Sequence, residues 1–219
     1  MYKELHKKYI IFFLITTLAF ILRFYLLNDH NAWHDEWHTL YVSDPSINFN
    51  ETIQRYLGDK GDTTLTEFYP VLYLFILKFF FKVFGYIDDN GRILSLIFGI
   101  ITVPLTMFLT EYLNKGKKFI VVGIVVSFNL FLIWQSLEIR AHSIFVAFSL
   151  LNIILFYKIL EKNGQFLFFC YFCSSLFLLS LWPMTGAIFF GKVIYLSKDF
   201  ILNKFRNDKI FILFFIIFI

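Results

Sequence analysis

The sequence has 219 residues, of which 58% are hydrophobic and 22% are aromatic, while only 16% are charged. A soluble domain of this size carries about a quarter charged residues and cannot bury so much apolar surface, so the composition excludes a water-soluble globular fold and indicates lipid as the solvent. The formal net charge of +4 is small, and the basic residues form no stripe of the kind that nucleic-acid binding requires.

The first apolar run covers residues 9–27 and follows a short charged start that contains Lys3, Lys7 and Lys8. A helix over this run would be about 28 Å long, which is enough to cross a bilayer. A cleaved signal peptide would have a shorter apolar region followed by a small-residue cleavage site. We therefore predict an uncleaved transmembrane helix, with Arg23 near its outer end and its side chain reaching the interface.

The rest of the chain alternates between polar connections and apolar runs. Residues 28–68 form the longest polar stretch and hold most of the acidic residues, and an apolar run at 69–84 follows. Later apolar runs cover residues 93–113, 119–134, 143–160, 166–181, 184–197 and 210–219. The last run is too short to span alone, so we expect the chain to be C-terminally truncated. These runs predict an all-α polytopic membrane protein with a single transmembrane domain over residues 1–219.

The run at 69–84 decides which connections share a side of the membrane. It is short for a span, and it carries Lys78 and Lys82, which are costly in hydrocarbon. If the run lies along the surface, the basic residues of the inner segments follow the positive-inside rule. These residues are Lys3, Lys7, Lys8, Lys115, Lys117, Lys118, Lys162, Lys198, Lys204, Arg206 and Lys209.

If the run at 69–84 crossed the membrane, this charge bias would largely disappear. We therefore predict an amphipathic helix at 69–84 that lies on the membrane, within an outer loop at 28–92. The N-terminus is then cytoplasmic in a multi-pass protein of the cell membrane. The acidic loop, residues 88–92 and residues 135–142 then all face the outer side.

A cluster of polar and aromatic residues, Trp33-His34-Asp35-Glu36-Trp37-His38, follows the first predicted span. Neighbouring residues of a helix point in different directions, so one carboxylate can act as a general base while the other holds a metal ion or a nearby residue. A solvated loop is the alternative interpretation. The spacing of His34 and His38 also suggests a zinc site, but the metalloprotease motif needs Glu directly after the first His, where this chain has Asp35.

Residues 135–142 form a second polar segment on the predicted outer side, in which Glu138, Arg140 and His142 alternate. An arginine can hold a phosphate through two parallel hydrogen bonds, and a neighbouring histidine adds positive charge. The alternative is an interfacial Glu–Arg pair that anchors a helix end.

Taken in chain order, these segments resemble the start of a GT-C glycosyltransferase, in the branch that contains protein O-mannosyltransferases and the lipid A aminoarabinose transferase. The resemblance covers about residues 28–145. Its matching positions are Asp35, Glu36 and Tyr41; Tyr69-Pro70-Val71-Leu72-Tyr73; Arg92, Ser95, Gly99 and Pro104; Gly116-Lys117-Lys118; and Ser136, Glu138, Arg140 and Ser143. The chain departs from the family pattern at Val71, at Leu137 in place of Gln, and at His142 in place of Tyr.

The resemblance implies a GT-C-like helix bundle whose outer loop contains membrane-lying helices. It implies transfer of a sugar from a polyprenyl-phosphate donor to a lipid, glycan or protein acceptor on the outer face, with membrane lipids as further partners and no nucleic acid. Asp35 would be the base or acceptor-positioning group, supported by Glu36. Substrate-binding roles fall on Glu138, Arg140, His142, Tyr69 and Arg92.

Some branches of this family use a divalent metal ion and others do not. Where a metal ion is used, the resemblance implies Asp35 and Glu138 as its ligands. The alternative function comes from a different class of protein. It is a non-catalytic membrane subunit or transport component that binds or hands over a lipid-linked saccharide.

Overall fold

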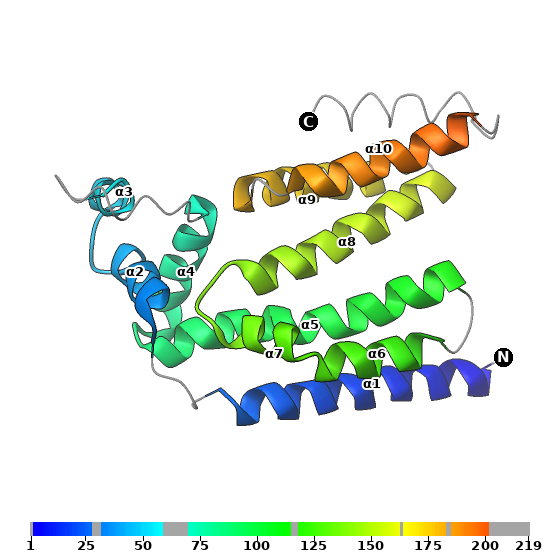
Figure 1. The fold of residues 1–219 in the computed structure, drawn as a ribbon, viewed down its shortest axis with the longest axis horizontal. Coiled ribbons are helices and arrows are strands. Elements are labelled where there is room, and N and C mark those ends of the chain that lie inside the picture. The colour runs from blue at the N-terminus through cyan, green and yellow to red at the C-terminus, as the bar shows by residue number, and fades with distance from the viewer. Residues whose placement is uncertain are drawn as a thin grey trace. The chain divides into compact units, whose positions relative to one another are not determined.

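A computed structural model describes residues 2–27, 32–58, 70–114, 118–162, 164–182 and 185–201 of the chain. Over these ranges every regular element is an α-helix (Figure 1). The helices are α1 (Tyr2–Tyr25), α2 (His34–Val42), α3 (Phe49–Tyr56), α4 (Val71–Phe84), α5 (Asp88–Asn114), α6 (Lys118–Phe128), α7 (Leu130–Leu137), α8 (His142–Glu161), α9 (Gln165–Leu181) and α10 (Thr185–Ile201). The chain divides into two compact units, residues 1–150 and residues 151–219, with the boundary inside α8.

Three of the described helices are long and apolar enough to cross a membrane, namely His6–Tyr25 within α1, the 27-residue α5 and the 20-residue α8. The pair α6 and α7 makes a fourth if it is counted as one span. Helices α9 and α10, expected as spans at 166–181 and 184–197, are apolar but shorter. The all-helical class and the presence of apolar spans are thus confirmed, and the run at 210–219 lies outside the described residues.

Helix α5 is the centre of the first unit and contacts α1, α4, α6 and α7 (Figure 1). Because these helices are apolar around most of their circumference, they pack through aliphatic and aromatic side chains rather than through a narrow stripe. One buried cluster between α1, α5 and α6 consists of Ile15, Ala19, Val103, Met107 and Phe119. A second cluster consists of Leu27, Leu96, Ile133 and Leu137.

Two glycines of α5 let the following segment approach the helix closely. A Cβ placed on Gly99 would lie 2.3 Å from the Cβ of Ser136 in α7, and one placed on Gly91 would lie 2.9 Å from Cγ2 of Ile139. Both distances are shorter than real carbon contacts allow, so only glycine permits this packing. As a result, α7 and the connection at 138–141 lie directly against α5.

The expected span at 119–134 is wrong in one respect, because it is two helices and not one. Helix α6 ends at Phe128, and α7 begins after Asn129 with its axis turned by 55°. The Asn129 side chain accepts a hydrogen bond from the backbone N–H of Leu132 at 3.0 Å, which is the geometry of an N-cap. The single asparagine therefore starts a new helix within an otherwise apolar run.

The prediction that Arg23 reaches the membrane interface is also wrong. Its side chain is 0% exposed, and its guanidinium donates to the carbonyls of Ala19 at 3.3 Å, Val126 at 3.3 Å and Ser127 at 3.2 Å. The last carbonyls of a helix have no partner within that helix, and an apolar environment offers no water to replace one. Arg23 therefore caps α6 at the point where the span breaks.

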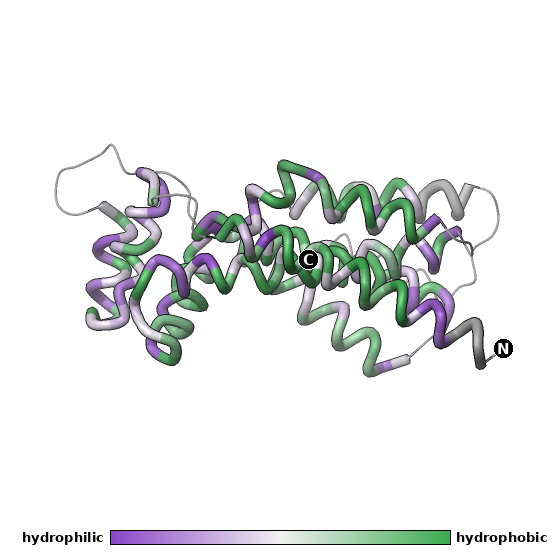
Figure 2. Tube along the Cα trace, turned by 90° about the horizontal axis from the view of Figure 1, so that it is seen from below, coloured by the Kyte–Doolittle hydropathy of each residue, from purple (hydrophilic) through white to green (hydrophobic). Residues whose placement is uncertain are grey.

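Helices α2, α3 and α4 form the polar end of the first unit. In Figure 1, α4 runs across the direction shared by α1 and α5, and in Figure 2 hydrophilic residues gather where α2 and α3 lie, at the left of the view. Lys78 of α4 is buried and donates to the Ile47 carbonyl at 2.8 Å and to Thr52 Oγ1 at 2.7 Å, which ties α3 to α4. The helix at 69–84 is observed as Val71–Phe84, and its position on the membrane surface stays a prediction.

Candidate functional site

The two carboxylates of the acidic motif point in different directions because they are neighbours on α2. Glu36 points inward and is buried. One of its oxygens accepts the backbone N–H of Ile139 at 2.8 Å, and the other accepts the backbone N–H of Trp33 at 3.3 Å, which closes the first turn of α2. Glu36 thus connects α2 to the connection between α7 and α8.

The same Glu36 carboxylate forms an ion pair with Arg92 of α5, with 3.4 Å between Nη2 and Oε2. The two side chains are only 3% and 5% exposed, so the pair is sealed from solvent. Arg92 also donates to the Leu27 carbonyl, at 3.5 Å, just beyond the end of α1. Separating the members of a buried pair leaves an uncompensated charge, so this pair fixes α2 against α5 and against the end of α1.

Asp35 forms the second ion pair, with Arg140, at 2.7 Å between Oδ2 and Nη2. These side chains are 16% and 19% exposed, so solvent reaches this pair but not the Glu36–Arg92 pair. The Arg140 guanidinium carbon also lies 5.3 Å from the centre of the Trp33 ring, within range of a cation–π contact. The backbone carbonyl of Arg140 accepts a hydrogen bond from Ser95 Oγ at 3.3 Å, which holds the residue against α5.

Glu138 completes the polar cluster on the connection between α7 and α8. Its carboxylate accepts a hydrogen bond from the Trp134 indole N–H. Burial raises the pKa of Glu138, and the charges of Glu36 and Asp35 add to the rise, while the Trp134 hydrogen bond and Arg140 reduce it. Beneath the cluster, burial also raises the pKa of the Tyr73 hydroxyl on α4. We call Asp35, Glu36, Arg92, Glu138 and Arg140 the carboxylate–arginine cluster.

The structure brings five of the sequence-predicted site residues into this cluster, from three segments far apart in the chain. His142 is half-buried at the first position of α8, two residues beyond Arg140. Tyr69 lies outside the described residues. Trp134 was not anticipated as a site residue, because in the sequence it is one more aromatic residue at the end of an apolar run.

The proposed metal ligands Asp35 and Glu138 both belong to the cluster. Within the described parts of the chain, no group of three or more His, Cys, Asp or Glu side chains gathers to hold a metal ion. Asp35 is paired with Arg140, and Glu138 accepts from the Trp134 indole N–H. A cation would therefore compete with a guanidinium at Asp35 and with an indole N–H at Glu138. The donor set does not fit a metal ion as it stands, and the metal requirement stays a prediction.

Comparison of the chain with models of protein families, with curated proteins and with solved structures finds no match. The features of the chain that bear on its function are therefore the geometry of the carboxylate–arginine cluster and the apolar helices around it.

Proposed function

We propose that this protein is a membrane glycosyltransferase that moves a sugar from a polyprenyl-phosphate carrier to an acceptor on the outer face of the membrane. The observation that carries the proposal is the 2.7 Å ion pair between Asp35 and Arg140. It joins the acidic motif after α1 to the polar segment before α8. These are the two segments to which the resemblance gives the acceptor base and the contact with the carrier phosphate.

The half-buried pair of Asp35 and Arg140 has the chemistry that this transfer requires. An acceptor hydroxyl attacks the anomeric carbon of the sugar, the bond between that carbon and the phosphate oxygen breaks, and the electron pair leaves with the phosphate. Asp35 takes the proton of the attacking hydroxyl. Arg140 stabilises the negative charge that develops on the departing phosphate.

The buried pair supports these roles without touching the substrates. Glu36 and Arg92 hold α2, α5 and the connection at 138–141 together, through the 3.4 Å ion pair and the 2.8 Å bond to the Ile139 N–H. Because Asp35 and Arg140 are carried on those same segments, their separation depends on this buried contact. We assign Glu36 and Arg92 as positioning residues.

The test is transfer of a radiolabelled sugar from a prenyl phosphate by membranes that contain the full chain. We expect Asp35→Asn to lower the transfer rate by about a hundredfold or more, because the carboxylate that accepts the proton is gone. The matched control is Asp44→Asn, which also removes a loop carboxylate near an arginine, Arg55 at 3.7 Å, outside the cluster. Asp44→Asn should transfer at the wild-type rate. A folded Asp35→Asn protein with unchanged transfer would contradict the proposal.

One observation favours the alternative of a non-catalytic subunit that handles a lipid-linked saccharide. The charge of the Asp35 carboxylate is already balanced by Arg140, as in an ion pair that only holds α2 against the 138–141 connection. This alternative predicts that membranes retain the prenyl-phosphate sugar without transferring it. It also predicts that Asp35→Asn changes the stability of the protein rather than the amount of sugar bound.

A further inference from the structure

The second unit contains a polar cluster of its own, inside apolar helices. The Lys192 ammonium of α10 donates to the Asn152 Oδ1 of α8 and lies 3.4 Å from the Tyr171 hydroxyl of α9. Asn152 in turn donates to the hydroxyls of Ser174 at 2.7 Å and Ser175 at 3.0 Å. We call these five residues the Lys192 cluster.

Lys192 lies near the middle of α10, a helix of 17 residues. It lies seven positions beyond Thr185 at the start of α10, which is about 10 Å of helix. The residue is only 5% exposed. Ionisable side chains at such positions are costly, and in membrane proteins they mark binding or transport sites.

Among the residues that the structure describes, the Lys192 amine has only neutral partners. None of the ion pairs between described residues includes Lys192. Its bonded neighbours are an amide and a phenol, and its ammonium lies 4.8 Å from the ring centre of Tyr171 and 4.9 Å from that of Phe189. Neutral acceptors and ring faces do not supply a counter-charge, so an oxyanion beside Lys192 would give its ammonium form the ionic partner that it lacks among the described residues.

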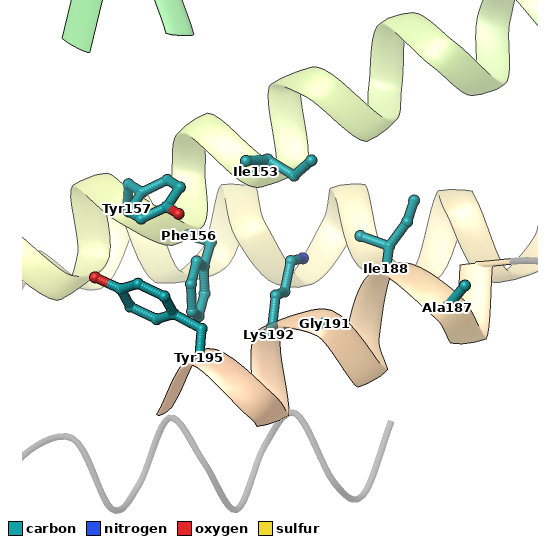
Figure 3. A pocket seen from close by; sticks show the side chains of 8 residues that line it. All are labelled: Ile153, Phe156, Tyr157, Ala187, Ile188, Gly191, Lys192 and Tyr195. Atoms are coloured by element: carbon teal, nitrogen blue, oxygen red, sulfur yellow. The ribbon is translucent and has the colours of Figure 1, made fainter. Parts of the chain in front are cut away.

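A pocket of about 280 Å³ opens beside Lys192 between α8 and α10 (Figure 3). It is lined by Ile153, Phe156, Tyr157, Ala187, Ile188, Gly191, Lys192 and Tyr195. Lys192 is the one charged residue among them, and the wall is otherwise aliphatic and aromatic. A Cβ placed on Gly191 would meet nothing within 4 Å, so this part of α10 is open. Such a pocket suits a ligand that is apolar except for one charged group.

We propose that this pocket binds an amphiphile from the membrane that carries a single oxyanion on an apolar chain. Lys192 pairs with the oxyanion, which replaces a buried unbalanced charge by a neutral pair. Ile153, Ile188 and the Phe156 ring contact the apolar chain. The site is independent of the carboxylate–arginine cluster, and it does not require glycosyl transfer.

The test uses a photoreactive dodecanoate that carries a diazirine in its alkyl chain, added to membrane vesicles that contain the full chain. After irradiation, the labelled residues are located by mass spectrometry of peptides. We expect labelling at residues 153–157 of α8 and 187–195 of α10. Excess dodecanoate should remove this labelling, whereas inorganic phosphate should leave it unchanged.

Two variants address the two halves of the site. Lys192→Met removes the charge, and Ile188→Trp fills the pocket while keeping Lys192, and each should lower labelling of these segments by about tenfold or more. The matched control is Phe190→Trp, the same aromatic replacement at an exposed position of α10, which should label like wild type. If Lys192→Met fails to fold, the labelling of Ile188→Trp tests by itself whether the pocket binds the amphiphile. Undiminished labelling in Ile188→Trp, or competition by phosphate but not by dodecanoate, would overturn the proposal.

Discussion

The Glu138 carboxyl group lies in surroundings that favour its neutral form. It is on the connection between α7 and α8, where burial and the nearby charges of Glu36 and Asp35 raise its pKa above the ordinary value of 4.5. The folded protein therefore holds the Glu138 proton more tightly than the unfolded chain does. By linkage, the resulting stability is fully present below the unfolded pKa and is lost as the pH rises through the folded pKa.

This linkage predicts how the pH dependence of stability changes in Glu138→Gln. The amide resembles the neutral carboxyl and does not titrate, so the variant lacks the loss that Glu138 causes. As the pH rises from about 4 to about 8, the Tm of the wild type should fall relative to that of Glu138→Gln. Thermal unfolding of both proteins in detergent across this range measures the difference. Two Tm curves that stay parallel would show that Glu138 has no raised pKa.

The two ion pairs predict different costs for similar substitutions. Glu36→Gln leaves the buried Arg92 without its counter-ion, and we expect a loss of about 3–5 kcal/mol in the free energy of unfolding. Asp35→Asn acts on a pair that solvent reaches, and its cost should be about 1 kcal/mol or less. Denaturant titration of both variants, followed by helix content, gives the two values. Equal losses would mean that the difference in burial between the pairs has no energetic consequence.

For the carboxylate–arginine cluster, the sequence predicted which residues lie together but not which carboxylate pairs with which arginine. The order of the motifs indicated that Asp35, Glu138 and Arg140 belong to one site. It did not predict that Glu36 turns inward to Arg92. Which of two adjacent carboxylates faces the interior depends on the rotation of α2 about its axis. The helical spacing of Trp37, Leu40 and Tyr41 does not define this rotation, because Trp37 and Tyr41 are exposed and only Leu40 is buried.

The close contact between α5 and α7 can be tested by a substitution at Gly99. Gly99→Ala would place a Cβ 2.3 Å from that of Ser136, so the two helices must separate. We expect a loss of about 1–3 kcal/mol in the free energy of unfolding. Gly186→Ala in α10 is the control, because a Cβ there meets nothing within 4 Å. Its unfolding free energy should be unchanged or slightly higher, and equal losses in both variants would refute the close packing.

The helices themselves followed from the length of the apolar runs, since an apolar chain in lipid must satisfy its backbone by forming helices. The break between α6 and α7 did not follow, because its run is apolar apart from Asn129. The break is stabilised by the Arg23 guanidinium of α1, which donates hydrogen bonds to the carbonyls of Val126 and Ser127. A donor so distant in the chain leaves no local pattern. The bounds of α2 and α3 did not follow either, because both lie within the polar stretch at 28–68, which was predicted as an outer loop.

Over the first unit as a whole, the polar contacts link the end of α1, the start of α5 and the connection at 138–141. Arg92 bonds Leu27 and Glu36, and Asp35 bonds Arg140. All three chain segments therefore meet at one end of this unit, and the assignment of that end to the outer side stays a prediction. The end of α1 and the start of α5 lie at the same end of the unit, so the chain between them must leave that end and return to it.

That condition predicts the compartments of exposed residues in the first unit. Ser46 lies between α2 and α3, Asp89 is in the first turn of α5, and Asn114 ends α5. With Cys170 and Cys173 replaced by serine, single cysteines at positions 46 and 89 should react with a membrane-impermeant maleimide added outside intact cells. A cysteine at 114 should react only after permeabilisation, because α5 with its 27 residues separates it from position 89. The helix α4 has 14 residues, about 21 Å, which is too short to carry position 89 to the opposite face.

Labelling of positions 46 and 89 from opposite sides would require α4 to cross the bilayer. Lys78 would then be held in hydrocarbon together with the Ile47 carbonyl and the Thr52 hydroxyl that it binds. Asp35 could no longer reach Arg140 without a chain that crosses back, so the Asp35–Arg140 ion pair and the transfer chemistry built on it would both be lost. Labelling of position 114 from outside together with 46 and 89 would remove α5 as a span while leaving the carboxylate–arginine cluster intact. The two failures are therefore distinguishable in a single set of cysteine variants.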